Sequence, residues 1–172
     1  MTRAHVRRAW WLLAAALCGC EGAMAPDPLR LDVEVVSLSA DGAEATAYLQ
    51  RAGRDLRAAR ASDDPQRREA LLSALLARPV PARVEGAALL RLEAAALLCE
   101  TWMQDVAGAR RAVGLLGPML TPARTLPLDP VTARALVCHG DAARRAGDDD
   151  AAATAYLRAI RLMQRLQEEA MP

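Results

Sequence analysis

Residues 133–165 read ARALVCHGDAARRAGDDDAAATAYLRAIRLMQR, and this stretch decides the fold. Gly147 is typical of a residue that ends a helix in the left-handed conformation, because glycine has no Cβ to penalise that backbone. One of the three aspartates at 148–150 is expected to cap a following helix. The stretch therefore predicts two helices joined by a tight turn. On the second helix the predicted buried stripe is Ala152, Tyr156, Ala159, Ile160 and Met163.

The same stretch resembles one unit of the tetratricopeptide repeat family. In that family a small residue lies where two helices cross, Gly-Asp makes the turn, and Ala, an aromatic residue and Ala recur on the second helix. The matching residues are Gly140, Gly147, Asp148, Ala152, Tyr156 and Ala159. Leu136 replaces the first-helix aromatic, and Gln164 replaces the closing proline. The resemblance covers about a fifth of the chain and implies a stack of helical hairpins.

The composition favours an all-α fold. Hydrophobic residues make up 53% of the 172 positions, but there is no Phe, so the core must be built from Leu and Ala. Both are strong helix formers, and β-branched residues are few. All 22 basic residues are Arg, and without Lys the chain has neither a phosphate-loop lysine nor a Schiff-base lysine. At this length, residues 41–172 are expected to form a single domain.

The first nineteen residues have the order of a secretory signal peptide. Three arginines within residues 1–8 precede an apolar run at 9–17 that is too short to span a bilayer. The following box, Leu-Cys-Gly-Cys, resembles the bacterial lipoprotein motif, which implies cleavage after residue 19 and acylation of Cys20. A plain secreted protein, cut after Ala25, is the alternative. The pair Arg7-Arg8 leaves both general and twin-arginine export open.

The lipoprotein resemblance also implies a location. Residue 21 is Glu rather than the aspartate that retains lipoproteins in the inner membrane, which implies the outer membrane, facing the periplasm. Removing the three leader arginines leaves 19 of 22 Arg against 21 Asp plus Glu, a net charge near −2, so nucleic-acid binding has no support. Residues 20–40 are predicted to be an extended tether, which spans roughly 25 Å if flexible.

Prolines and aspartates divide residues 41–172 into three predicted hairpins. The first, second, third and fifth expected helices cover 42–60, 65–77, 82–99 and 130–146. The fourth runs from the turn at 100–105 to 117, and the sixth follows the aspartates at 148–150. Within the third helix the run AALLRLEAAALLC at 87–99 is interrupted only by Arg91 and Glu93, so the helix is expected at the centre of the domain. The turns lie about 40 and 45 residues apart, longer than the family's 34. We therefore expect a right-handed stack of three antiparallel α-hairpins, similar to tetratricopeptide repeats.

The sequence offers little chemistry for catalysis. His139 is expected to be a partly buried structural histidine, and no serine lies in a nucleophile-elbow context. Cys138 and His139 project about 100° apart on a helix, which is wrong for joint metal ligation. The aspartates at 148–150 lack the spacing of a calcium loop. We expect no enzyme activity, no cofactor and no metal.

Two further features leave alternatives open. Cys99 and Cys138 lie on neighbouring first helices, but one is late on its helix and the other near the middle, which favours two free thiols over the disulfide that export would permit. A basic region is expected to be a solvated helix face, with contact to anionic lipid headgroups as the alternative. It consists of Arg51, Arg54, Arg57, Arg60, Arg67 and Arg68.

The family resemblance points to a binding groove. In tetratricopeptide proteins the first helix of each hairpin lines a concave groove, and the corresponding residues here are Arg134, Val137, Asp141, Arg144 and Arg145. Three arginines against one aspartate favour an acidic segment or a chain-terminal carboxylate as ligand; ordinary solvated arginines are the alternative. The resemblance implies a non-enzymatic, lipid-anchored module that binds another envelope protein, as in assembly factors of outer-membrane machines. A constitutive structural subunit is the second hypothesis, and an enzyme is the least favoured.

Overall fold

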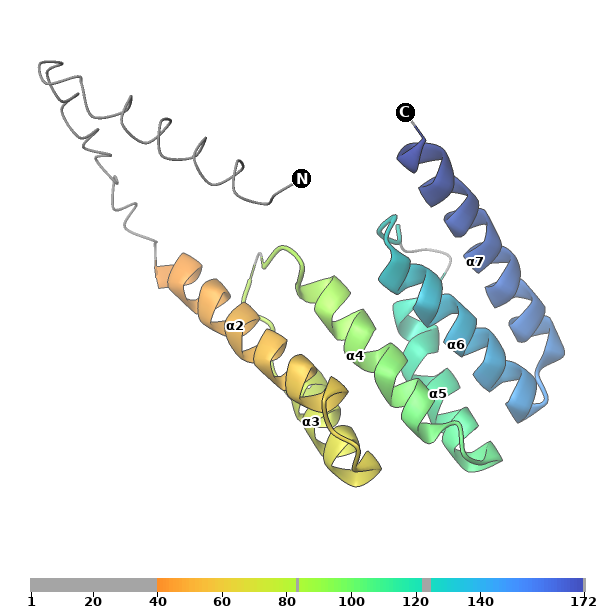
Figure 1. The fold of residues 1–172 in the computed structure, drawn as a ribbon, viewed down its shortest axis with the longest axis horizontal. Helices are drawn as coiled ribbons and strands as arrows, with labels where there is room; N and C mark the ends of the chain where they lie inside the picture. The colour runs from red at the N-terminus through yellow and green to blue at the C-terminus, as the bar shows by residue number, and fades with distance from the viewer. Residues whose placement is uncertain (1–39, 83, 122–124, 172) are drawn as a thin grey trace, which may run out of the picture. The chain divides into compact units, whose positions relative to one another are not determined.

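The computed structural model describes residues 40–82, 84–121 and 125–171 (Figure 1). The predicted signal peptide, Cys20 and the predicted tether up to residue 39 lie outside these residues. The described part of the chain contains six helices and no strand, so the all-α prediction is confirmed. The helices are α2 (Ala40–Arg60), α3 (Pro65–Ala77), α4 (Ala87–Trp102), α5 (Val106–Met119), α6 (Pro130–Ala146) and α7 (Asp149–Ala170). None of them is long and apolar enough to cross a bilayer.

The predicted helix boundaries at aspartates and at Gly147 are confirmed. Asp64 accepts a hydrogen bond from Gln66 N at 2.9 Å, and Asp129 accepts one from Val131 N at 2.8 Å, so each caps a helix that begins with proline. Gly147 has φ 88° and ends α6. Asp148 caps α7 by accepting from Ala151 N at 2.9 Å. Local side-chain chemistry therefore sets these ends.

Three predicted boundaries of α4 and α5 are wrong by a few residues. α4 begins at Ala87 rather than residue 82, because Pro79 and Pro81 prevent a helix there and the preceding Gly86 has φ 79°. It also continues to Trp102, beyond the predicted end at 99. α5 continues to Met119 with Pro118 in its last turn, so the proline marks the end of that helix only to within two residues.

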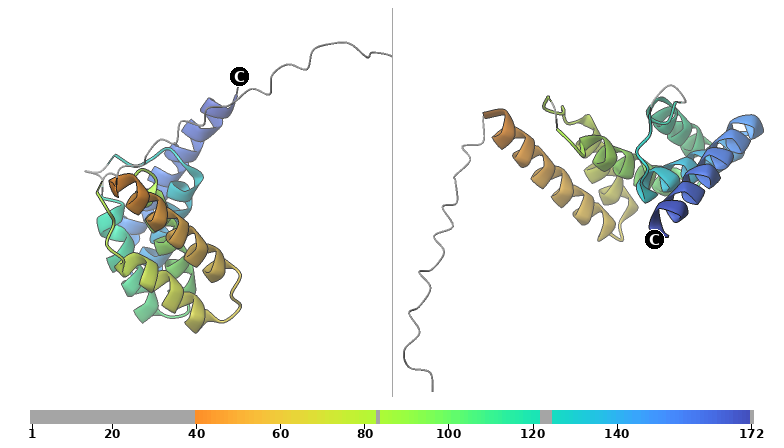
Figure 2. Two further views of the ribbon diagram at one scale, coloured as in Figure 1. Left: turned by 90° about the vertical axis from the view of Figure 1, so that its left-hand side faces the viewer. Right: turned by 90° about the horizontal axis from the view of Figure 1, so that it is seen from above.

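The central position of α4 is confirmed. It packs against α2, α3, α5 and α6, and residues 94–99 are all buried (Figures 1 and 2). α4 contributes Leu97 and Leu98 to a core shared with α2 and α3. It contributes Ala95, Ala96 and Cys99 to a second core shared with α5, α6 and α7. Because both cores meet on this helix, an apolar surface on nearly all of its sides is required.

The remaining contacts follow chain order. Each helix packs against the next one along the chain, and in addition α2 packs on α4 and α4 packs on α6 (Figure 1). Therefore α4 has both α2 and α6 as neighbours, in addition to the helices that precede and follow it in the chain.

The predicted buried stripe of α7 is partly wrong. Ala152 and Ala159 are buried and Tyr156 is half-buried, but Ile160 and Met163 are 47% and 40% exposed. The side that packs inward instead carries Ala152, Ala155, Ala159, Leu162 and Leu166. Apolar residues occupy more than half of the circumference of α7, so periodicity alone does not identify which part of that arc is covered.

Candidate partner-binding surface

One long side of α6 faces outward and carries all five residues predicted to line a groove. Arg134, Val137, Arg144 and Arg145 are exposed, and Asp141 is half-buried. The opposite side of the helix is buried in the core through Thr132, Ala133, Ala135, Leu136, Cys138, Ala142 and Ala143. The helical spacing inferred from the sequence therefore agrees with the structure.

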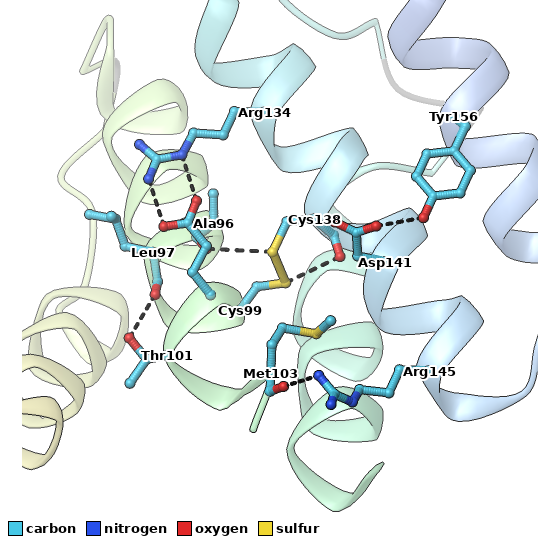
Figure 3. Close-up of a disulfide and its surroundings, with 11 residues drawn as sticks. Ala96, Leu97, Cys99, Thr101, Met103, Arg134, Cys138, Asp141, Arg145 and Tyr156 are labelled. Atoms are coloured by element: carbon cyan, nitrogen blue, oxygen red, sulfur yellow. Dashed lines mark hydrogen bonds and ion pairs between the residues drawn. A yellow bond between two sulfur atoms is a disulfide. The ribbon is translucent and has the colours of Figure 1, made fainter. Parts of the chain in front are cut away.

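Arg134 forms a bidentate ion pair with Glu100 at the end of α4. Its Nε and Nη2 donate to the two carboxylate oxygens at 2.7 and 2.6 Å (Figure 3). This pair raises the pKa of the Arg134 guanidinium above its usual range. Both side chains remain more than 40% exposed. The charge of Arg134 is thus already balanced within the chain, although the pair is accessible to a partner.

Tyr156 of α7 completes this surface from the other side. Its hydroxyl donates to Asp141 Oδ1 at 2.6 Å (Figure 3). Its ring lies against the backbone of Gly140. A Cβ on Gly140 would lie 2.7 Å from the ring, so this position requires glycine. The hydrogen bond to Asp141 raises the pKa of the Tyr156 hydroxyl, and the neighbouring Arg144 lowers it. Gly140 and Tyr156 therefore fix the spacing of α6 and α7.

The third arginine is also engaged. The guanidinium of Arg145 donates to the carbonyl oxygen of Met103, just beyond the end of α4 (Figure 3). Two of the three predicted ligand-binding arginines therefore have carboxylate or carbonyl acceptors inside the chain, whereas the exposed Arg144 lies beside the Tyr156 hydroxyl. The structure weakens the case for a ligand held by three arginines.

Exposed apolar side chains lie beside these charges. Val137 is 37% exposed on α6, and Ile160 and Met163 are 47% and 40% exposed on α7. α6 and α7 are antiparallel, and Tyr156 lies against Gly140. The turn before Gly140 therefore faces the turn after Tyr156, which brings Val137 and Ile160 to the same side. We call this set the α6–α7 surface: Arg134, Val137, Asp141, Arg144, Arg145, Ile160 and Met163.

The preference for free thiols is wrong, because Cys99 and Cys138 form a disulfide (Figure 3). Their Cα atoms are 6.4 Å apart, and both residues are buried. α4 continues to Trp102, so Cys99 lies inside the helix and not at its end as expected. Small residues then let α4 and α6 approach closely, among them Ala96 and Ala142. The disulfide joins the two helices directly beneath the Arg134–Glu100 ion pair.

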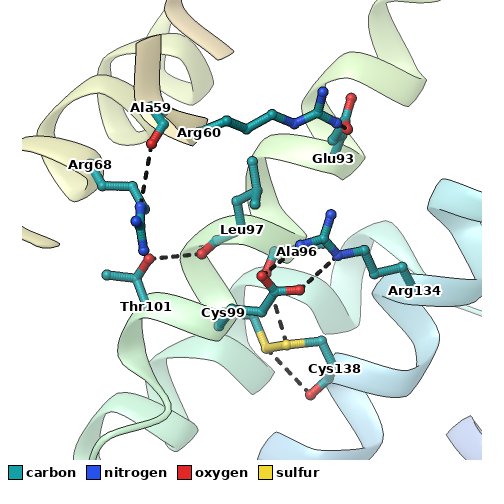
Figure 4. A network of polar contacts seen from close by, with 11 residues as sticks. Ala59, Arg60, Arg68, Glu93, Ala96, Leu97, Cys99, Thr101, Arg134 and Cys138 are labelled. Carbon is teal, nitrogen blue, oxygen red and sulfur yellow. Dashed lines mark hydrogen bonds and ion pairs between the residues drawn. A yellow bond between two sulfur atoms is a disulfide. The ribbon is translucent and has the colours of Figure 1, made fainter. Parts of the chain in front are cut away.

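The basic region splits into structural and exposed arginines. Arg60 pairs with Glu93 of α4, and Arg68 donates to the carbonyl of Ala59 at 3.3 Å (Figure 4). Arg68 also donates to the carbonyl of Ser62 at 2.5 Å. Arg51, Arg54, Arg57 and Arg67 are exposed and take part in none of these contacts. Contact of these four with lipid headgroups stays a prediction.

The described residues offer no obvious metal centre. No group of three His, Cys, Asp or Glu side chains in residues 40–82, 84–121 and 125–171 is placed to hold an ion. The sulfur of Cys138 is part of the disulfide, so this residue has no thiolate to offer a metal ion. His139 is half-buried, and burial followed by the charge of Arg158 lowers its pKa, with Asp148 opposing.

Sequence reasoning missed Glu100, Ile160 and Met163 as members or neighbours of this surface. Glu100 stood in the predicted turn, and only the crossing of α4 and α6 places it against Arg134. A usable signal existed for α7: beyond its first turn, the arc of the helix between the buried side and Leu157 carries apolar residues, Gln164 and Gln167 but no charge. Such a wide uncharged arc exceeds what one neighbouring helix can cover.

Comparisons of this chain with protein-family models, with curated proteins and with solved structures found no match.

Proposed function

We propose that this chain is a non-enzymatic, lipid-anchored helical module that binds another protein in the bacterial cell envelope. The helical domain would be a right-handed stack of three antiparallel hairpins, α2–α3, α4–α5 and α6–α7. The packing of α2 on α4 and of α4 on α6 supports this arrangement, because first helices of successive hairpins are neighbours in such stacks. The anchor would be an acylated Cys20, as the leader sequence implies.

The observation that carries the proposal is the α6–α7 surface. Ile160 and Met163 are large apolar side chains that are exposed on α7, and Val137 is exposed on α6. Apolar residues that cluster on an exposed face are typical of interaction sites. Arg144 and the accessible Arg134–Glu100 pair lie on the same outward side of α6 as Val137. The partner would be an apolar segment with an acidic flank or a terminal carboxylate that reaches Arg144.

A test of partner binding should change the apolar group first. The double variant Ile160→Glu and Met163→Glu places two charges where the partner would bury apolar area. Loss of a central contact costs about 2 kcal/mol or more, which is roughly a thirtyfold loss of affinity. Co-purification of envelope proteins with the native, membrane-anchored chain should fall accordingly, while the helical circular dichroism signal is retained. Arg144→Glu should produce a smaller loss.

The matched control reverses charges elsewhere. The triple variant Arg51→Glu, Arg54→Glu and Arg57→Glu changes exposed residues of α2 and should leave co-purification unchanged. Equal recovery of the partner with the Ile160/Met163 variant would refute the assignment of this surface.

The anchor has its own test. Cys20→Ser should release the protein from the membrane fraction, because a single thiol carries the acyl groups. Unchanged fractionation and detergent extraction of this variant would refute the lipoprotein assignment without bearing on the α6–α7 surface.

A constitutive subunit of a larger envelope complex is the second candidate. The same exposed Ile160 and Met163 favour it, because a permanent neighbour would cover them. The isolated full chain would then aggregate or self-associate in a concentration-dependent manner, and the Ile160→Glu and Met163→Glu variant would be more soluble. Sedimentation of both proteins over a hundredfold range of concentration separates this case from a reversible interaction.

A further inference from the structure

A pocket of about 880 Å³ opens where α4 begins and α5 ends. Its lining is mostly apolar and comes from the loop before α4, from both helices and from the loop before α6; it includes Val80, Pro81, Leu92, Met119, Leu126 and Pro127. None of these residues belongs to the α6–α7 surface. Sites that bind small molecules have volumes of roughly 300–1,000 Å³ and combine apolar walls with a few polar groups. The pocket is therefore large enough for a ligand of that class.

Arg91 is the cation in the described lining of this pocket. α4 carries three charged residues, and the other two are neutralised by neighbouring helices. Glu93 pairs with Arg60 of α2, and Glu100 pairs with Arg134 of α6. For Arg91 the described part of the chain provides no carboxylate within ion-pair distance.

The Arg91 side chain is nevertheless held in place. Its Nη1 donates to the carbonyl oxygen of Arg78 at 3.2 Å, and the residue is half-buried. A hydrogen bond to a carbonyl orients the guanidinium but does not balance its charge. Glu85 also lines the pocket; it is exposed, and the structure gives it no ion pair with Arg91. A positive charge fixed against apolar walls favours an anion with an apolar body.

We propose that this pocket binds an amphiphile with a single anionic head and an alkyl tail. The head would form charge-assisted hydrogen bonds with Arg91, and the tail would lie against Leu92, Met119 and Leu126. Such a ligand satisfies both parts of the site, because an apolar molecule leaves Arg91 unbalanced and a small polar anion leaves the walls unfilled. The proposal does not depend on a lipid anchor or on a protein partner.

The test uses the full chain with Cys20→Ser, so that no acyl group competes. Calorimetric titrations with dodecanoate, dodecyl phosphate and dodecanol, each below its aggregation concentration, compare two anionic heads with an uncharged one. At least one anion should bind tenfold or more tightly than dodecanol, and the ratio of the two anions identifies the head group. Equal affinity for all three ligands, or no binding of any, would overturn the proposal.

Variants then locate the site. Arg91→Gln should weaken anion binding roughly tenfold to a hundredfold and leave dodecanol unaffected, because a charge-assisted hydrogen bond is lost. Arg91→Lys should retain part of the affinity. The matched control Arg110→Gln, at an exposed position of α5, should change nothing.

A second variant covers the case in which Arg91→Gln loosens the loop near Arg78. Ala88 is an exposed lining residue, and Ala88→Trp fills the pocket without changing its charge. This variant should abolish binding of all three ligands, whereas Glu85→Gln should tighten anion binding severalfold. Anion binding that persists in both Arg91→Gln and Ala88→Trp, or that weakens in Glu85→Gln, would show that the pocket is not the site.

Discussion

The two interfaces that meet on α4 contain side chains of different sizes. Toward α2 and α3, α4 buries large side chains, Leu97 and Leu98, in a core that also contains Leu, Ala and Tyr48. Toward α6, it places Ala95, Ala96 and Cys99 in a core where alanines are the most frequent residues. Large side chains gain more apolar area, while small ones let helix backbones approach closely. The first interface therefore depends on burial and the second on proximity.

This difference predicts unequal local stability. The close approach of α4 and α6 permits the Cys99–Cys138 disulfide, which fixes the second interface covalently. The α2–α3 pair is joined to α4 by noncovalent contacts: burial, the Arg60–Glu93 ion pair and the hydrogen bond from Arg91 to the carbonyl of Arg78 at the end of α3. Repeat-like stacks are stabilised by contacts between neighbouring units, so units can separate one at a time. We expect α2 and α3 to open first as denaturant is added.

The largest expected effect comes from removing the disulfide. In a Cys18→Ser and Cys20→Ser background, Cys99→Ser with Cys138→Ser should lower the free energy of unfolding by about 4 kcal/mol, as chain entropy predicts for a loop of this length. Urea unfolding with and without reductant measures the change. The sulfur of Cys99 lies 3.3 Å from the Cys138 carbonyl, so a reduced thiol would have an acceptor, and reduction should cost no more than the substitutions. Equal stability of oxidised and reduced chains would contradict the disulfide.

The first interface should be most sensitive to loss of a buried leucine. Leu98 is 1% exposed in the core with α2 and α3. Leu98→Ala should cost about 3 kcal/mol, because it removes apolar contacts and leaves a cavity. Hydrogen exchange should then show faster opening of α2 and α3, with α6 and α7 still protected by the disulfide. Uniform acceleration over all helices would show that the two interfaces unfold as one unit.

The sequence predicted what local chemistry controls and failed where two helices must be placed together. Asp64, Asp129 and Gly147 act within a few residues, so their effect on helix ends was readable. The disulfide was missed because the register of α4 against α6 depends on how the two helix backbones cross, which helix periodicity does not give. The pairing of Arg134 with Glu100 depends on the same crossing. On α7, periodicity identified an apolar arc but not which part of it α6 covers.

A smaller effect is expected from the ion pair at the first interface. Arg60 has 48% of its side chain exposed and Glu93 has 13%. Exposed pairs contribute at most about 1 kcal/mol, and the partial burial of Glu93 places this pair near that limit. A double-mutant cycle with Arg60→Ala and Glu93→Ala measures the coupling by urea unfolding. A coupling of zero would leave burial as the whole attachment of α2 to α4.

The smallest effect concerns pH and should appear only on the side of α6. Burial of His139, followed by the nearby charge of Arg158, lowers the pKa of its imidazole below about 6.5. The folded state therefore favours the neutral ring, so this contribution to stability is complete above the ordinary pKa and is lost as pH falls toward the lowered one. Melting temperatures should decline between pH 7 and pH 5.5, and His139→Gln should flatten that decline. NMR titration of the His139 ring reports the pKa directly, and a value at or above the ordinary one would contradict the assignment. The ring faces Gly117 of α5, so α2 and α3 should show no corresponding change in hydrogen exchange.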